Sequence, residues 1–211
     1  MSFDLATHLG AMTRSVRDIE KDGKPARSLI AARVFDTDAA DLWDALTDKD
    51  RIKRWFLPVS GDFVLNGRFQ FEGNAAGSIT GCDPERSLDV TWEYGGGVSW
   101  VTIRLESAQG GTRLELEHVA IVDPSWGDFG SGAVGIGWDT GFMGLARHLA
   151  TGEAVPEGAA EAWMATPEAK EFYRLTSAAW GRADIASGMP EGKAMAAAEQ
   201  IRAMYAGEQP G

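Results

Sequence analysis

Cysteine and histidine are scarce in this sequence, which excludes several kinds of site. The chain of 211 residues has one cysteine, Cys82, and three histidines, His8, His118 and His148. A single cysteine cannot form an internal disulfide, and its isolation is typical of a reducing compartment. The histidines are too widely spaced along the chain to suggest the ligand set of a zinc site. We therefore expect no internal disulfide and no metal centre.

Basic residues and long apolar runs are scarce as well. Lys and Arg number 20 against 31 Asp and Glu, so the formal net charge is −11. This charge disfavours binding to nucleic acid or to an anionic membrane surface, because both need basic patches. No apolar run approaches the roughly 20 residues that span a bilayer, and residues 1–22 lack the pattern of a signal peptide. We expect a cytoplasmic protein that neither binds nucleic acid nor inserts into a membrane.

Motifs for covalent or cofactor chemistry are missing or stand in the wrong context. The sequence contains neither G-x-S-x-G nor a Walker motif. Residues 130–135 read G-x-G-x-x-G, but a dinucleotide site needs this motif directly after a strand, in a strand–helix–strand unit. Here a loop, residues 123–130, precedes the motif, and an alanine-rich helical region follows. We interpret these glycines as the flexible start of a helix and expect no cofactor.

What the sequence does contain is a glycine-rich amphipathic segment, residues 137–150. Its large apolar residues recur at i, i+4, i+7 and i+11, as one stripe of a helix does: Trp138, Phe142, Leu145 and Leu149. Each glycine in this helix costs about 1 kcal/mol relative to alanine. Burial stabilises it by about 1.5–3 kcal/mol per large side chain, so we expect the helix to form. Its glycine flank, shared with His148, lets another backbone or a bound molecule come close.

Residues 68–120 alternate between apolar and polar side chains, as the strands of an antiparallel sheet with one buried face do. Turn residues separate five strand segments, which are residues 68–72, 78–83, 88–94, 101–106 and 113–120. Upstream, strands 13–19 and 27–35 flank an Asp-Gly turn, and Asp38 and Asp48 begin two short helices. A helix over residues 137–150 is about 20 Å long and crosses roughly four or five such strands.

Short motifs along the chain together resemble a known family. They are Val34-Phe35-Asp36, residues 42–48, Arg54-Trp55-Phe56, Gly67-Arg68-Phe69, Val90-Thr91-Trp92, residues 114–118 and Gly137-Trp138. Over about residues 27–151 they resemble the bacterial branch of the START-like (SRPBCC) superfamily that is related to the activator of the heat-shock chaperone ATPase. The resemblance implies an α+β, helix-grip fold, in which a curved antiparallel sheet wraps around a long C-terminal helix. It also implies a hydrophobic, lipid-binding or small-molecule cavity and no fixed catalytic residues.

Three segments follow from this resemblance. Residues 1–26 form an N-terminal extension with a hairpin strand, residues 27–152 form the START-like domain, and residues 153–211 form an alanine-rich helical extension. Residues 168–187 and 191–206 have the composition of two helices, with prolines near their starts. Since alanine-rich helices bury little area, we expect the extension to pack on the main domain, where it is a lid over the cavity or a homodimer contact.

The expected binding residues are apolar or aromatic, with one histidine: Trp55, Phe56, Phe71, Trp92, His118, Trp138, Phe142 and Leu145. Aromatic side chains line ligand pockets, although the same residues serve equally well as plain core. His118 alternates in phase with Leu114 and Leu116, so we expect it to point inward. There it is a core histidine satisfied by neighbouring groups, or a residue that orients a ligand. His148 is a second pocket group or a solvated side chain.

Arg33 shares a strand face with Leu29 and Phe35, which leaves two interpretations. In one, it is an inward charge that pairs with a carboxylate of a ligand. In the other, which we favour, it lies on the outer face and pairs with a glutamate of a neighbouring strand.

We therefore expect a protein that binds a small hydrophobic or amphipathic ligand in a cavity under residues 138–149. A protein-interaction module resembling a co-chaperone is the first alternative. A cyclase or hydrolase that uses His118 as a base is the second. No catalytic residue is identified, and the sequence favours a binding protein over an enzyme.

Overall fold

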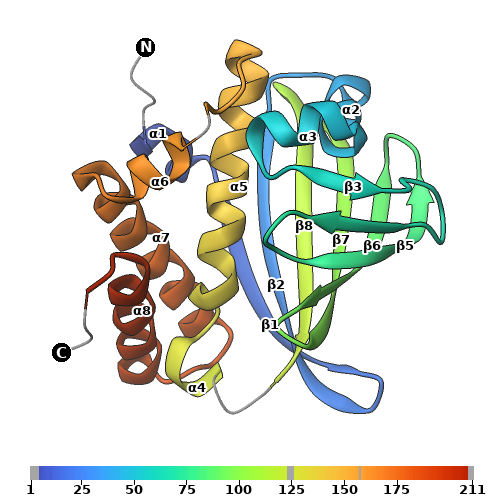
Figure 1. Ribbon diagram of the computed structural model, residues 1–211. Coiled ribbons are helices and arrows are strands. Elements are labelled where there is room, and N and C mark those ends of the chain that lie inside the picture. The colour runs from blue at the N-terminus through green and yellow to red at the C-terminus, as the bar shows by residue number, and fades with distance from the viewer. Residues whose placement is uncertain (1–4, 123–125, 157, 209–211) are drawn as a thin grey trace. The chain divides into compact units, whose positions relative to one another are not determined.

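The computed structural model, drawn as a ribbon in Figure 1, describes residues 5–122, 126–156 and 158–208. The helices are α1 (Leu5–Gly10), α2 (Ala39–Thr47), α3 (Lys49–Trp55), α4 (Trp126–Phe129), α5 (Gly132–Thr151), α6 (Ala159–Met164), α7 (Pro167–Ala186) and α8 (Glu191–Tyr205). The strands are β1 (Thr13–Lys21), β2 (Lys24–Phe35), β3 (Val59–Gly61), β4 (Arg68–Phe71), β5 (Ala76–Asp83), β6 (Ser87–Tyr94), β7 (Gly97–Ala108) and β8 (Gly111–Ile121). None of the helices in the described ranges is long and apolar enough to cross a membrane.

All eight strands belong to one curved sheet, in the order β1-β2-β8-β7-β6-β5-β4-β3. From β3 to β8 each strand pairs with its neighbour in antiparallel fashion. The alternation of residues 68–120 thus predicted β4 to β8, whereas β3 has three residues, too few to show a pattern of period two. With the long helix α5, the sheet has the α+β, helix-grip fold that the resemblance implied.

The two short helices that follow β2 begin at aspartates, as the sequence predicts. The carboxylate of Asp38 accepts a hydrogen bond of 2.8 Å from the backbone N–H of Asp41. The carboxylate of Asp48 does the same for the N–H of Arg51, also at 2.8 Å. Each cap satisfies an N–H group that has no partner within its helix, which fixes where α2 and α3 start.

The chain forms two compact units. The helical unit contains residues 1–31, 121–142 and 155–211, and the sheet unit contains residues 32–120 and 143–154. In the helical unit α7 lies against β1, α1, α6 and α8, and in the sheet unit α2 lies against β7 and α3 against β3. The predicted division into residues 1–26, 27–152 and 153–211 stays a prediction.

In the helical unit, the glycines of the G-x-G-x-x-G sequence are sites of close packing. A Cβ atom on Gly130 would lie 2.9 Å from a carboxylate oxygen of Asp184, and one on Gly132 would lie 2.9 Å from Ile201. A Cβ on Gly135 would run into the indole ring of Trp180. The start of α5 is therefore packed against α7 and α8, and the flexible start expected from the sequence is wrong.

The carboxylate of Asp184 occupies the N-terminus of α5. It accepts hydrogen bonds from the backbone N–H and the hydroxyl of Ser131, at 3.0 and 2.6 Å. Arg27 donates to the same carboxylate at 3.0 Å. The N-terminus of a helix favours negative charge, and here a side chain of the chain itself supplies it. The carboxylate of Asp184 thus occupies the position at which a phosphate would bind at the N-terminus of a helix.

A second buried ion pair lies about two turns further along α5. The guanidinium of Arg14 donates to both carboxylate oxygens of Asp139, at 2.9 and 3.2 Å, and the indole N–H of Trp180 donates to the nearer one at 3.1 Å. The Asp139 side chain is 0% exposed and that of Arg14 7%. Burial raises the pKa of Asp139 to about 6, although Arg14 opposes the shift. The pair connects β1, α5 and α7 within the helical unit.

Removal of the Asp139 carboxylate should destabilise the protein strongly. In an Asp139→Ala variant the buried guanidinium of Arg14 loses its counter-charge, so we expect the free energy of unfolding to fall by about 3–5 kcal/mol. The measurement is urea unfolding at pH 7.5. The control is Glu171→Ala, which removes an exposed ion pair with Arg174 and should change stability by less than about 1 kcal/mol. Equal losses in the two variants would contradict this role of the buried pair.

Candidate functional site

One face of the strands of the sheet unit is apolar and buried, and we call it the inner face. In the register of β7 and β8, Val101 is opposite His118 and Leu105 is opposite Leu114. All four side chains are buried, and His118 is 4% exposed. His118 therefore points to the same face as Leu114, as its alternation in the sequence predicts.

His118 and Ser99 form a polar pair within this apolar face. The Nε2 atom of His118 lies 2.8 Å from the hydroxyl oxygen of Ser99, and this hydroxyl donates to the backbone carbonyl of Trp92 at 3.1 Å. A hydroxyl has a single proton, and a carbonyl oxygen only accepts. Since the proton of Ser99 points to Trp92, His118 carries its proton on Nε2 and donates it to Ser99.

The imidazole of His118 is neutral at physiological pH. Burial disfavours the charged form and lowers the pKa of His118 from 6.5 to about 4. A base with such a pKa is weak near pH 7, where general bases with a pKa close to the working pH are the most effective. His118 is therefore better suited to donate a hydrogen bond in a fixed orientation than to act as a general base.

Four of the predicted binding residues lie together in an aromatic cluster, which also includes Phe69. Ring centroids are 5.6 Å apart for Trp55 and Phe56, 5.1 Å for Phe56 and Phe71, and 5.6 Å for Phe71 and Trp92. Phe71 is buried, whereas Trp55, Phe56 and Trp92 are half-buried. These rings pack on one another, so part of the cluster is core. Because Trp92 is opposite Ser99 in the register of β6 and β7, the cluster adjoins the polar pair.

The glycine flank of α5 allows the close approach that the sequence predicts, at one position in particular. A Cβ atom on Gly144 would overlap the backbone carbonyl oxygen of Trp55, the last residue of α3. Leu145, the next residue, is 1% exposed. The C-terminal half of α5 is therefore seated against α3 at a distance that no larger residue permits.

His148 is a buried packing residue, and neither of the roles expected from the sequence describes its contacts. It is 4% exposed. Its Nε2 accepts from the Nε–H of Arg51 at 3.4 Å, so its Nδ1–H faces the backbone carbonyl of Glu153 at 3.3 Å. Arg51 also pairs with Asp41 and Asp44, at 2.7 and 2.9 Å. This network, which the sequence analysis missed, ties α5 to α2 and α3.

The remaining predicted residues, Trp138 and Phe142, lie on the part of α5 that belongs to the helical unit. Phe142 is 3% exposed and Trp138 is half-buried. They flank Asp139, whose buried ion pair was not recognised from the sequence. The sequence did offer one signal for this ion pair, because Asp139 is an acidic residue directly after Trp138, a member of the apolar stripe.

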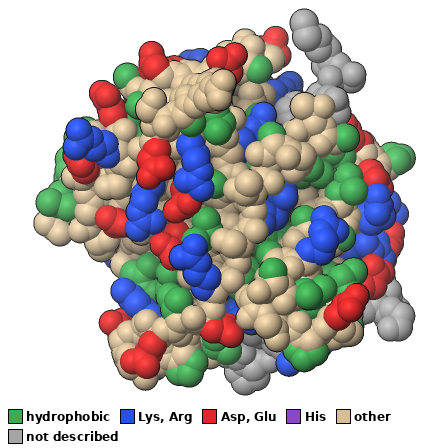
Figure 2. Space-filling model, turned by 180° about the vertical axis from the view of Figure 1, so that it is seen from behind, with side chains coloured by type: hydrophobic (Ala, Val, Ile, Leu, Met, Phe, Trp, Pro, Cys, Tyr) green, Lys and Arg blue, Asp and Glu red, His purple; other side chains and the backbone are tan. Residues whose placement is uncertain are grey.

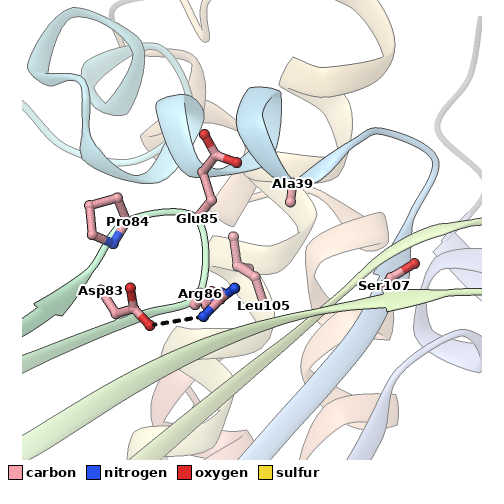
Figure 3. Close-up of a pocket in the computed structure, with 7 residues that line it drawn as sticks. All are labelled: Ala39, Asp83, Pro84, Glu85, Arg86, Leu105 and Ser107. Atoms are coloured by element: carbon pink, nitrogen blue, oxygen red, sulfur yellow. Dashed lines mark ion pairs between the residues drawn. The ribbon is translucent and has the colours of Figure 1, made fainter.

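A pocket that the sequence analysis did not predict opens beside α2 (Figure 3). It has a volume of about 690 Å³ and is lined by Ala39, Asp83, Pro84, Glu85, Arg86, Leu105 and Ser107. Asp83 and Arg86 approach each other to 3.8 Å at its rim. Leu105 points from β7 toward α2 and belongs to the inner face. The pocket therefore borders the inner face at Leu105, at the α2 end of the strands.

In the part of the chain that the structure describes, no group of three or more His, Cys, Asp or Glu side chains is placed to hold a metal ion.

The family model described as "Activator of Hsp90 ATPase homolog 1-like protein" matches residues 36–150, more than half of the chain. The chain belongs to this family. The match covers α2 to β8 and nearly all of α5, and so contains the whole aromatic cluster and the His118–Ser99 pair. The family assignment agrees with the resemblance seen in the sequence motifs.

Similar solved structures extend this likeness beyond the family's core. The crystal structure of CalU16 from Micromonospora echinospora is 30% identical, with a TM-score of 0.67, over 82% of this chain and 98% of that one. Its solution structure gives 29% identity and a TM-score of 0.68, over 84% and 97%. Protein MLL2253 from Mesorhizobium loti, 22% identical with a TM-score of 0.53 over 58% and 96%, shows the fold alone. No curated protein sequence matches the chain.

The coverage of CalU16 reaches into the helical extension. More than residues 1–150 must be aligned to account for 82% of this chain. Part of residues 151–211 therefore has a counterpart in CalU16, in addition to the domain that the family model describes.

A methyl group at Gly144 should separate α5 from α3. We expect Gly144→Ala to lower the free energy of unfolding by about 1–3 kcal/mol, because the added Cβ meets a backbone carbonyl and forces a shift. Gly137 on the same helix is the matched control, since a Cβ there has its nearest contact at 3.9 Å, the hydroxyl of Tyr205. Gly137→Ala should be neutral or stabilising by up to about 1 kcal/mol. Urea unfolding of both variants measures these changes. An unchanged free energy of unfolding in Gly144→Ala would contradict the close approach of α5 to α3.

The low pKa of His118 makes stability depend on pH. His118 takes up a proton near pH 6.5 in the unfolded chain and near pH 4 in the folded one. The contribution of this difference to the free energy of unfolding is therefore present above pH 6.5 and is lost as the pH falls toward 4. Between pH 7 and pH 4 the wild type should lose about 3 kcal/mol more than a His118→Asn variant. Urea unfolding at the two pH values measures the difference. Parallel losses in both proteins would show that His118 is not buried in neutral form.

Proposed function

We propose that this protein binds a small hydrophobic or amphipathic ligand at the inner face of its sheet unit. The observation that carries the proposal is the position of the His118–Ser99 pair beside the half-buried ring of Trp92. Ligand sites of soluble proteins combine apolar and aromatic walls with a small number of placed polar groups. Here the cluster supplies the apolar wall, and the polar pair fixes the orientation of the ligand.

The pocket beside α2 gives this ligand a route from solvent. Its volume of about 690 Å³ lies within the range of roughly 300–1,000 Å³ that small-molecule sites occupy. Leu105 is common to the pocket and the inner face, so a ligand that enters beside α2 first meets Leu105, six residues along β7 from Ser99. Leu145 of α5 is proposed as a further contact of this ligand, whereas Trp138 and Phe142, which belong to the helical unit, stay predicted binding residues.

A co-chaperone-like interaction with another protein is the second candidate. It is favoured by the name of the family, whose description refers to activation of the Hsp90 ATPase. In this reading the outer face of the sheet matters, where Arg104 pairs with Glu117 at 3.3 Å and Arg113 with Glu115 at 2.6 Å. An enzyme that uses His118 as a base is less well supported, because the pKa of about 4 makes His118 a weak base.

We place this function in the cytoplasm, without nucleic acid and without membrane insertion. The net charge of −11 supports the exclusion of nucleic acid. On the face shown in Figure 2, Lys and Arg side chains stand among Asp and Glu side chains, unlike the continuous basic patch of a nucleic-acid interface. Residues 153–211 would act as a lid or as a homodimer contact; light scattering of the full chain tests the second role, because a dimer contact requires a dimer in solution.

Titration with Nile red, a neutral dye whose emission shifts in apolar surroundings, tests the proposal. Wild-type protein should bind the dye saturably. Trp92→Ala should weaken binding at least about tenfold, because an aromatic wall is lost, and His118→Asn should weaken it without abolishing it. Trp100 is the matched control, since it pairs with Thr91 and so lies on the outer face of the same strands.

Trp100→Ala should leave the affinity for Nile red within about twofold. Circular dichroism at the titration temperature establishes that each variant is folded. Absence of saturable binding to the wild type, or equal effects of the two tryptophan substitutions, would favour the co-chaperone-like reading.

A further inference from the structure

The inner face of the sheet unit becomes more exposed toward the turn that joins β6 and β7. On β6, the inner-face residues Val90, Trp92 and Tyr94 are 8% exposed, half-buried and 63% exposed in turn. On β7 the same change occurs, because Val101 is 3% exposed and Ser99 is half-buried. The inner face is therefore open to solvent at this end, next to the polar pair.

The register of β6 and β7 places Tyr94 beside this pair. Trp92 is opposite Ser99, and Tyr94, two residues further along β6, is opposite Gly97. Residues two apart in a strand point to the same face, so Tyr94 shares the inner face with Trp92. Diagonal neighbours on one face of an antiparallel pair are about 7–8 Å apart, a distance that aromatic side chains span. The ring of Tyr94 therefore lies within reach of Ser99.

The side chain of Tyr94 has room to move and no contact that holds it elsewhere. Among the described residues it takes part in neither a ring contact nor a hydrogen bond. Gly97 across the strand has no side chain, and a Cβ there would meet only the carbonyl oxygen of Tyr94, at 3.6 Å. A Cβ on Gly95 or Gly96 in the turn would have no atom within 4 Å. Nothing in the sheet thus competes for the space beside this ring.

We propose that the ring of Tyr94 folds over the bound ligand at this end of the inner face and slows its release. Trp92 and the polar pair contact the ligand from the sheet, and Tyr94 covers it on the solvent side. An aromatic ring gains free energy when it covers apolar surface. This inference rests on the proposed function and adds to it the residue that controls how long the ligand is held.

The distances along the sheet favour release at this end. Leu105, the inner-face residue of the pocket, is six residues from Ser99 on β7, which corresponds to about 20 Å. Tyr94 is a diagonal neighbour of Ser99. From the polar pair, the path past Tyr94 is therefore the shorter of the two paths to solvent.

The test is the rate at which bound Nile red leaves the protein, followed by the loss of its emission on rapid dilution at pH 7.5. Tyr94→Ala should raise this rate about tenfold, because the contact with an aromatic ring is lost and such losses appear mainly in the dissociation rate. Tyr94→Phe keeps the ring and should stay within about twofold of the wild type. Since Tyr94 is 63% exposed, we expect both variants to fold, which circular dichroism checks.

Val98→Ala is the matched control, because Val98 belongs to the same hairpin and is 52% exposed but lies opposite Glu93, on the outer face. Its dissociation rate should equal that of the wild type. An unchanged rate in Tyr94→Ala, an equal increase in Val98→Ala, or a Tyr94→Phe variant as fast as Tyr94→Ala would overturn this inference. In these cases saturable dye binding would still support the proposed function. Absence of dye binding to the wild type would overturn the proposed function, and this inference with it.

Discussion

The approach of Gly144 to the carbonyl oxygen of Trp55 is the constraint on which the sheet unit depends. Only glycine lets α5 come this near to α3. The indole N–H of Trp55 donates to the carbonyl of Ala45 at 2.9 Å, which holds the ring in place. From this ring, aromatic contacts pass through Phe56 and Phe71 to Trp92. Ser99 is hydrogen-bonded to both the backbone of Trp92 and the ring of His118. One continuous series of contacts therefore leads from the contact between α5 and α3 to the inner face.

Buried polar groups serve different purposes in the two units. In the helical unit, Asp139 and Asp184 are ion-paired with Arg14 and Arg27, at 2.9 and 3.0 Å, and are surrounded by hydrogen-bond donors of α5 and α7. Such groups specify how elements meet, because a misplaced carboxylate would be buried without a partner. On the inner face, the neutral imidazole of His118 stands among apolar side chains at a place that adjoins half-buried aromatic rings. The proposed ligand would meet this second kind of group.

Local patterns in the sequence predicted most of the elements, and contacts between distant residues explain most of what was missed. Periods of two and 3.6 identified β4 to β8 and the helix over residues 137–150, and aspartates marked the starts of α2 and α3. The partners of Asp139 and Asp184, Arg14 and Arg27, are 125 and 157 residues away, so no window of sequence contains them. The pocket is formed by separate segments for the same reason. Arg33 shares a strand face with Phe35, which is 3% exposed, whereas Val34 is 38% exposed, so strand parity favours the inward side over the outer face that we preferred.

The central claim is that a ligand binds beside the imidazole of His118, which is neutral and carries its proton on Nε2. The most direct measurement is the ¹H–¹⁵N correlation spectrum of the histidine side chains, recorded at pH 7 with and without saturating Nile red. The account predicts one imidazole with a protonated Nε2 and an unprotonated Nδ1, assigned to His118 by its absence in a His118→Asn variant, whose signals shift when the dye binds. A His118 ring that is doubly protonated at pH 7, or whose signals stay unchanged while the dye is bound, would contradict it.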